Sequence, residues 1–291
     1  SSQVTVSSIS GTTNFGTTTI TKSNQIITLT RQSDGNVVAS STSLSIVLDS
    51  LKHPIISGAL GTLNYKTTDA NDISIDEGDL AAGSLDPNVL GQTTKSIVHT
   101  TNKAGSVTSL VTTIRQFFNP LTATDKIVIS GFSSDYVFNQ GSTTVCTVQS
   151  DSSNVAVSTS TDTSGSNRIL TVTLDSGSNI GNGDVDTIIT CNNILIPRKV
   201  TSSVNNIAVK STDTNDITRD EDTSFSLDAI VPNDLSSLSR SFSKSKAGEV
   251  GTLTFGFENF NPIPVDGKIV LTLPSGFDSS QVTVSSITGT T

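Results

Sequence analysis

An internal repeat constrains the fold of this chain more than any other feature of the sequence. SSQVTVSSISGTT at Ser1–Thr13 returns as SSQVTVSSITGTT at Ser279–Thr291, and the only difference is Ser10 against Thr288. The repeat is almost unchanged across a period of about 278 residues, whereas a weaker repeat has an offset of about 143 residues. A chain with such spacing is expected to fold as similar units in series.

The weaker repeat divides the chain into one full unit and two partial units. The matched segments are Ala247–Phe277 with Ala104–Phe132, Ser23–Thr30 with Ser166–Thr173, Ser45–Pro54 with Thr187–Pro197, Lys66–Gly78 with Lys210–Asp222, and Asp86–Leu90 with Val231–Leu235. We therefore predict a complete unit at 104–246. The predicted unit at 1–103 lacks its first strands, and 247–291 carries the first strands of the next unit.

Short β-strand patterns recur throughout each unit. The residues in these patterns are β-branched or alternate between apolar and polar, and Gly, Pro, Asn, Asp and Ser separate the runs. The predicted strands include 252–257, 268–273, 281–287 with its copy at 3–9, 17–22, 25–30 and 43–48. At most, 79–85 and 233–241 could each form a single helical turn. The pattern predicts an all-β fold of tandem Ig-like antiparallel β-sandwich units, each of about 140 residues.

One segment resembles a known kind of repeat. Ala247–Phe277 has the form AG, then LTFGF, a spacer, and GKIVLTLPSGF. This is similar to the opening of tandem Ig-like β-sandwich repeats in giant secreted or cell-surface proteins, of filament or adhesin type, from microbes and protists. The middle unit departs from the pattern with LVTTIRQFF and KIVISGF, which lacks the proline. The resemblance implies an extracellular structural array.

Composition excludes several classes of function. The net charge is −9 and no basic stripe is present, which argues against binding to nucleic acid. No apolar run has the length of a membrane span. The histidines His53 and His99 have no counterpart in the other unit, and we interpret both as surface or loop residues. With aromatic residues at 4%, a carbohydrate-binding platform or an enzyme is also disfavoured.

Two cysteines lie in strand-like runs, Cys146 in TTVCTVQ and Cys191 in TIITCNN. Their separation suits two strands of one sandwich, so we predict a disulfide, with a pair of buried free thiols as the alternative. Their counterparts in the other unit lie near Ser7 and Asp49. The bridge would therefore belong to one unit only, and the fold would not depend on it.

An acidic segment is the strongest candidate for binding chemistry. Its candidate ligands are Asp69, Asn71, Asp72, Asp76 and Glu77, repeated as Asp213, Asn215, Asp216, Asp220 and Glu221. Calcium prefers six to eight hard oxygen ligands, which such a segment can supply. The wording also resembles the D-x-N-D linkers of cadherin-type repeats, although the rest of that pattern is missing. The alternative is a plain acidic turn, because Asp and Asn favour turns.

Together these observations predict a structural repeat segment of a large extracellular filament or surface protein. It would be mechanical, self-assembling and non-catalytic, and its partners would be adjacent repeats or neighbouring chains. The alternative is a calcium-stiffened extender region of a microbial adhesin. If the chain is a whole subunit, strand exchange between molecules would have to cover the open edges of its partial units. If it belongs to a longer chain, neighbouring repeats would supply those strands covalently.

Overall fold

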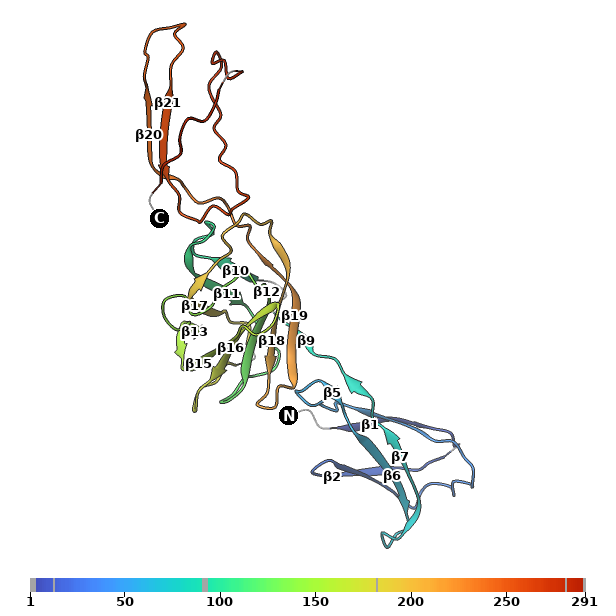
Figure 1. Ribbon diagram of the computed structural model, residues 1–291. Helices are drawn as coiled ribbons and strands as arrows, with labels where there is room; N and C mark the ends of the chain where they lie inside the picture. The colour runs from blue at the N-terminus through green and yellow to red at the C-terminus, as the bar shows by residue number, and fades with distance from the viewer. Residues whose placement is uncertain (1–3, 13, 91–93, 182, 281, 290–291) are drawn as a thin grey trace. The chain divides into compact units, whose positions relative to one another are not determined.

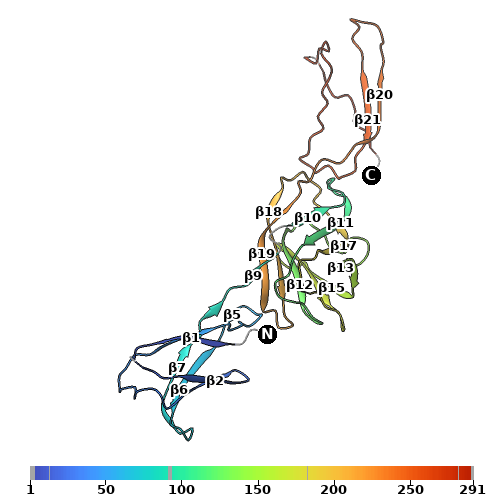
Figure 2. The same ribbon diagram turned by 180° about the vertical axis from the view of Figure 1, so that it is seen from behind.

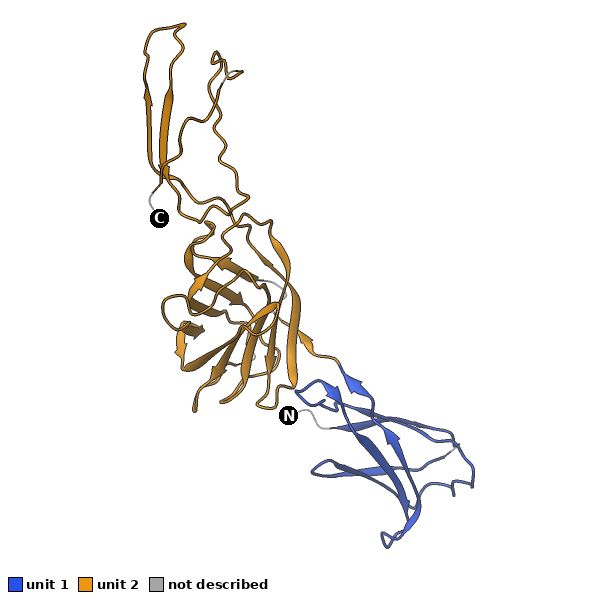
Figure 3. Ribbon diagram, viewed as in Figure 1, with its two compact units in different colours: residues 1–85 blue, residues 86–291 orange. Residues whose placement is uncertain are grey.

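A computed structural model describes residues 4–12, 14–90, 94–181, 183–280 and 282–289. Every regular element among these residues is a β-strand (Figure 1, and from behind in Figure 2), so the all-β prediction is confirmed. None of the described segments forms a helix that could cross a membrane. The chain divides into two compact units, Ser1–Leu85 and Asp86–Thr291 (Figure 3).

The first unit consists of four separate two-stranded sheets. Antiparallel pairing joins β1 to β4, β2 to β3, β5 to β8 and β6 to β7. The strands are β1 (Thr5–Ser10), β2 (Thr18–Ser23), β3 (Ile26–Arg31), β4 (Ser45–Asp49), β5 (Gly58–Ala59), β6 (Thr62–Thr68), β7 (Ser74–Ala81) and β8 (Ser84–Leu85). No described side chain of this unit is buried. Isolated hairpins of this kind are marginally stable in water.

The second unit contains a complete sandwich. Its strands are β9 (Asn88–Val89), β10 (Lys95–His99), β11 (Val107–Ile114), β12 (Lys126–Ser133), β13 (Cys146–Ser150), β14 (Ser153–Val155), β15 (Val157–Asp162), β16 (Asn167–Leu174), β17 (Thr187–Leu195), β18 (Val204–Thr212) and β19 (Thr218–Leu227). They pair in the order β14-β13-β17-β11-β10-β19-β18-β12-β16-β15, with β9 beside β19. The pairs β10–β19 and β9–β19 are parallel, and the other pairs are antiparallel.

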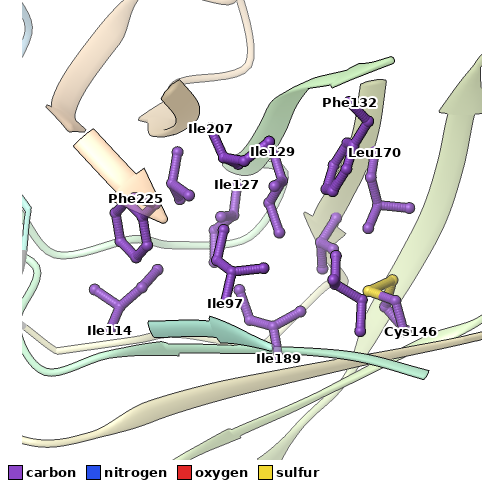
Figure 4. Packing of buried hydrophobic residues seen from close by; sticks show 14 of the residues in the cluster. Ile97, Ile114, Ile127, Ile129, Phe132, Cys146, Leu170, Ile189, Ile207 and Phe225 are labelled. Carbon is purple, nitrogen blue, oxygen red and sulfur yellow. A yellow bond between two sulfur atoms is a disulfide. The ribbon is translucent and has the colours of Figure 1, made fainter. Parts of the chain in front are cut away.

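The two halves of this strand order face each other across one apolar core. Ile97, Ile114 and Ile189 project from β10, β11 and β17 toward side chains of the opposite half (Figure 4). Those opposite side chains include Ile127, Ile129, Leu170, Ile207 and Phe225, all of which are fully buried. Among the described residues, the buried apolar core is confined to residues 90–230. We call residues 86–230 the middle sandwich.

The remainder of the second unit is an open hairpin followed by chain without regular structure. Strand β20 (Ser236–Phe242) pairs with β21 (Leu253–Glu258). The sequence allowed at most a single helical turn at 233–241 and at 79–85, and neither segment forms one, because these residues contribute to β20 and to β7 and β8. The predicted strands at 268–273 and 281–287 do not form strands among the described residues. Residue 281 lies outside the described residues. A strand needs a hydrogen-bonded neighbour, and no described strand pairs with these segments.

The hairpins of the weaker repeat recur with the same register in the structure. Across β10 and β11, Ile97 lies opposite Thr112, and across β20 and β21, Arg240 lies opposite Phe255. These two pairs have the same offset of 143 residues, as do the pairs from Ser96–Thr113 to His99–Leu110 and their counterparts from Ser239–Gly256 to Phe242–Leu253. Strand β10 precedes the predicted unit boundary at Ala104, yet it belongs to the sheet of the middle sandwich.

Candidate functional site

The acidic segment of the middle sandwich forms the turn of the β18–β19 hairpin. The Asp213 carboxylate accepts hydrogen bonds from the backbone N–H groups of Asn215 at 2.9 Å and Ile217 at 2.8 Å. Desolvation raises the pKa of Asp213, but these hydrogen bonds outweigh it together and the pKa is lowered. Asp216 adopts a positive φ of 63°, which Asp tolerates better than most residues. The carboxylate of Asp213 therefore serves to hold the turn.

The first copy of the segment repeats this geometry at the tip of the β6–β7 hairpin. Asp69 accepts hydrogen bonds from the backbone N–H groups of Asn71 and Ile73, both at 2.9 Å. Those hydrogen bonds lower the pKa of the Asp69 carboxyl group. Asp72 has the same φ of 63° as its counterpart. Both copies are thus acidic turns with a structural use for the first aspartate.

The later acidic residues of each segment lie on strands and separate from the turn. Asp220 is fully buried, and its carboxylate accepts hydrogen bonds from Nδ2 of Asn119 at 2.9 Å, the Asn119 backbone N–H at 3.2 Å and Oγ of Ser211 at 3.2 Å. Burial raises the pKa of Asp220 despite these bonds. In the first copy, Thr67 donates to Asp76 at 3.3 Å, as Ser211 does to Asp220.

Neither copy of the acidic segment gathers its five predicted calcium ligands around one point. Glu77 and Glu221 pair across their hairpins with Lys66 and Lys210, so they lie one position along the strand from Asp76 and Asp220. Successive side chains of a strand point to opposite faces. Among the described residues, no group of three or more His, Cys, Asp or Glu side chains could hold a metal ion. Calcium binding stays a prediction from the sequence.

The two cysteines form a disulfide in the middle sandwich. Cys146 on β13 lies directly opposite Cys191 on β17, and both side chains are buried. In the first unit, the pairing of β1 with β4 places Thr5 opposite Asp49. Neither partner of that pair is a cysteine.

His99 is buried at the end of β10, so its interpretation as a surface or loop residue was wrong. Its Nδ1 lies 2.7 Å from Asp228, and its Nε2 lies 3.2 Å from the hydroxyl of Tyr136. Desolvation lowers the pKa of His99 although Asp228 opposes it. The counterpart of His99 by the hairpin register is Phe242, which also carries an aromatic ring. His53 is exposed, as predicted.

Apolar side chains that are buried in the middle sandwich have exposed counterparts in the first unit. Ile207 and Val209 of β18 are fully buried. Their counterparts on β6, Leu63 and Tyr65, are 48% and 54% exposed. Val47 of β4 is likewise exposed at the place where β17 has a buried isoleucine. The apolar face that is buried in the middle sandwich is therefore exposed on the strands of the first unit.

The chain after the middle sandwich also exposes apolar side chains whose counterparts in the middle sandwich are buried. Ile127 and Ile129 of β12 are fully buried, whereas their counterparts Ile269 and Leu271 are 51% and 47% exposed. The open side of this segment encloses a hollow of about 460 Å³, whose lining includes Phe255, Phe260, Ile263, Val270 and Leu271. Exposed apolar faces of this extent are typical of surfaces that bind a partner.

Sequence reasoning missed the role of Asn119. Its signal was present, because the Asn-Pro pair at Asn119 returns at Asn261 in the weaker repeat. A conserved spacing of this kind does not reveal which group the side chain contacts. Only the fold brings Asn119 against Asp220, which lies about 100 residues later in the chain.

No protein-family model matches the sequence, and no curated protein matches it. Two solved structures, both of the Bacillus cereus major pilin subunit BcpA, show a distant likeness. The first, a variant of BcpA, is 11% identical with a TM-score of 0.30, covering 79% of this chain and 76% of the pilin. The second is 12% identical with a TM-score of 0.29, covering 81% and 67%. Both scores are too low to establish a shared fold.

Proposed function

We propose that this chain is a non-catalytic structural segment of a large extracellular filament or surface protein. Its units would be 1–103, 104–246 and 247–291, and its partners would be copies of itself. One observation carries the proposal: on both sides of the middle sandwich, apolar side chains are exposed at positions whose repeat counterparts in the middle sandwich are buried. Burying such faces against a neighbouring copy is favourable in proportion to the apolar area removed from water.

Other features support an extracellular location. Disulfides persist in oxidising compartments, and the middle sandwich contains the Cys146–Cys191 bridge. The repeated hairpins share their register next to the turn and the hydrogen bonds of the turn, which suits a part that holds a fixed spacing. These features favour a mechanical role.

The experiment that tests this function measures assembly. The purified chain is followed by sedimentation velocity and electron microscopy over a range of concentrations, once with millimolar calcium and once with a chelator. We expect filaments or long oligomers that grow with concentration in both conditions. A chain that stays monomeric at every concentration would contradict the proposal, and monomers stabilised by calcium would favour the adhesin extender instead.

A further inference from the structure

We propose that residues 236–277, here called the donor segment, complete the first unit of a second copy by inserting between its strands. This inference rests on the proposed function and specifies its contact. The middle sandwich supplies the template, because its strands β10, β11 and β12 have no counterparts among the described strands of the first unit. The donor segment is the repeat counterpart of those three strands.

The template fixes the register of the inserted strand. In the middle sandwich, β12 lies between β18 and β16, with Val128 opposite Lys210 on one side and Thr171 on the other. The counterparts of these residues are Val270, Lys66 and Thr28. Residues 268–275 of one copy would therefore lie between β6 and β3 of the next. Leu271 would then point into the core beside Tyr65, as Ile129 does beside Val209.

The same template places β21 against β4. In the middle sandwich, β11 pairs with β17, and Thr112 lies opposite Ile189. The counterparts are Phe255 on β21 and Val47 on β4, which are 43% and 45% exposed. Both side chains of this pair would be covered in one step, and the hollow of the donor segment would be filled by the inner face of the first unit.

A buried ion pair of the template has been replaced on both sides together. Arg219 donates to the Asp125 carboxylate at 2.9 Å, and both side chains are buried. The counterpart of Arg219 in the first unit is Ile75, and the counterpart of Asp125 in the donor segment is Gly267. A buried charge without its partner is costly, so loss of both charges is expected only where the two positions share a core.

The residues of one polar contact of the template are also present in the donor segment and the first unit. Asn119 hydrogen-bonds to the buried Asp220, and the counterparts of these residues are Asn261 and Asp76. In the isolated chain, Nδ2 of Asn261 donates instead to the carbonyl of Ala104 at 2.8 Å. Assembly would exchange that bond for one to Asp76. An apolar replacement and a conserved polar pair thus point to the same partner.

Cysteine cross-linking tests the register. The double variant K66C/V270C places thiols at positions that the template sets directly opposite each other, within disulfide reach. The matched control T62C/V270C moves one thiol four residues along β6, roughly 13 Å away and out of reach. Both variants are oxidised mildly at assembling concentrations and separated on a denaturing, non-reducing gel. The native cysteines are buried and already bridged.

We expect a ladder of covalent oligomers for K66C/V270C and at least tenfold less for T62C/V270C. Filaments without a ladder for K66C/V270C would overturn the register and leave the proposed function standing. Cross-linked monomers would show that the segment folds back on its own chain, which overturns exchange between copies. Uncross-linked monomers would overturn both the inference and the proposed function.

The second copy is either a separate chain or the next part of one longer chain, and the contact chemistry is the same. The mass of the denatured native protein distinguishes these sources. A band near 30.2 kDa indicates separate chains that exchange strands. A much larger band indicates that neighbouring copies are joined covalently, with the same register expected between them.

Discussion

Single residues of the middle sandwich are stabilised by polar partners that are buried with them. Arg219 and Asp125 are an example, since each carries a charge that is removed from water. The backbone N–H of Thr122 also donates to Asp125 at 2.7 Å. In the donor segment, Pro264 stands at the position of this threonine and has no N–H to satisfy. Buried polar groups need partners, which explains why Arg219, Asp125 and Thr122 all have apolar or non-donating counterparts together.

Replacing one member of this ion pair should be far more costly than replacing both. We expect D125G alone to lower the free energy of unfolding by about 3–5 kcal/mol, because Arg219 remains buried and unpaired. The double variant R219I/D125G carries the residues found at the counterpart positions, Ile75 and Gly267, and should recover more than half of that loss. Urea unfolding of the middle sandwich measures both values. Additive losses from R219I and D125G would contradict this interpretation.

His99 should make the stability of the middle sandwich depend on pH between 7 and 5. Desolvation lowers its pKa in the folded state, so the folded state keeps the ring neutral. Its contribution is complete above the unfolded pKa of about 6.5 and is lost as the pH falls below that value. We expect the melting temperature to decrease from pH 7 to pH 5.

The matched control is H99F, which introduces the residue found at the counterpart position, Phe242. The phenyl ring does not titrate, so the decrease in melting temperature between pH 7 and pH 5 should become smaller. The other ionisable groups beside His99 are Asp228 and Tyr136, and both are retained in H99F. Burial raises the pKa of Tyr136, so its hydroxyl stays neutral throughout this range. An unchanged pH profile in H99F would assign the effect to another group.

At the scale of elements, the Cys146–Cys191 bridge joins β13 to β17 in one sandwich only. The cysteines are 45 residues apart, a loop for which the chain-entropy relation gives about 4 kcal/mol. We expect the double variant C146S/C191S to lower the free energy of unfolding of the middle sandwich by about 2–4 kcal/mol. Assembly should persist, because the bridge lies outside the donor segment. Loss of assembly with an intact fold would contradict this.

The donor segment should be sensitive to charge on its inward face alone. Leu271 is the counterpart of the fully buried Ile129, whereas Thr272 is the counterpart of Ser130 and would lie on the other face of the inserted strand. We expect L271D to weaken assembly at least tenfold, because it would bury an unpaired carboxylate. The control T272D carries the same charge and should assemble nearly as well, because Thr272 does not line the hollow. Sedimentation velocity measures both, and equal effects would contradict the proposed orientation.

The sequence predicts elements well where the repeat and the alternation of side chains agree. The strands at β1, β2, β3, β4 and β21 lie close to their predicted ranges, since each alternates over five to seven residues. The sequence allowed at most a single helical turn at 233–241, and the pairing of β20 with β21 makes this segment a strand instead. Local pattern cannot reveal such pairing, nor the burial of His99 beside Tyr136.

The candidate site was predictable only in part for the same reason. The repeated acidic segment was visible in the sequence, and both copies form turns with equal hydrogen bonds. The first aspartate of each copy lies in the turn, whereas the later acidic residues lie on opposite faces of the next strand. This depends on where the turn of each hairpin ends. The contact between Asn119 and Asp220 depends on strands that are distant in sequence. These long-range contacts are determined by topology, which residue patterns do not contain.

At the scale of the whole molecule, only residues 90–230 have a complete core among the described residues. The strands on either side have apolar faces that remain in contact with water in the single chain. Exposed apolar strands are unfavourable and prone to pairing with other chains. An account in which neighbouring copies complete each other explains why both faces retain apolar residues at the positions where the middle sandwich buries them.

Hydrogen exchange at increasing protein concentration tests this central claim most directly. Amides of the middle sandwich should be protected at every concentration, because its core is complete in one chain. Amides of β6 and of residues 268–275 should exchange rapidly in dilute solution and become protected together as oligomers form. The claim that copies complete each other's sandwiches is contradicted if the exchange rates of these two segments do not change with protein concentration, or if only one segment becomes protected.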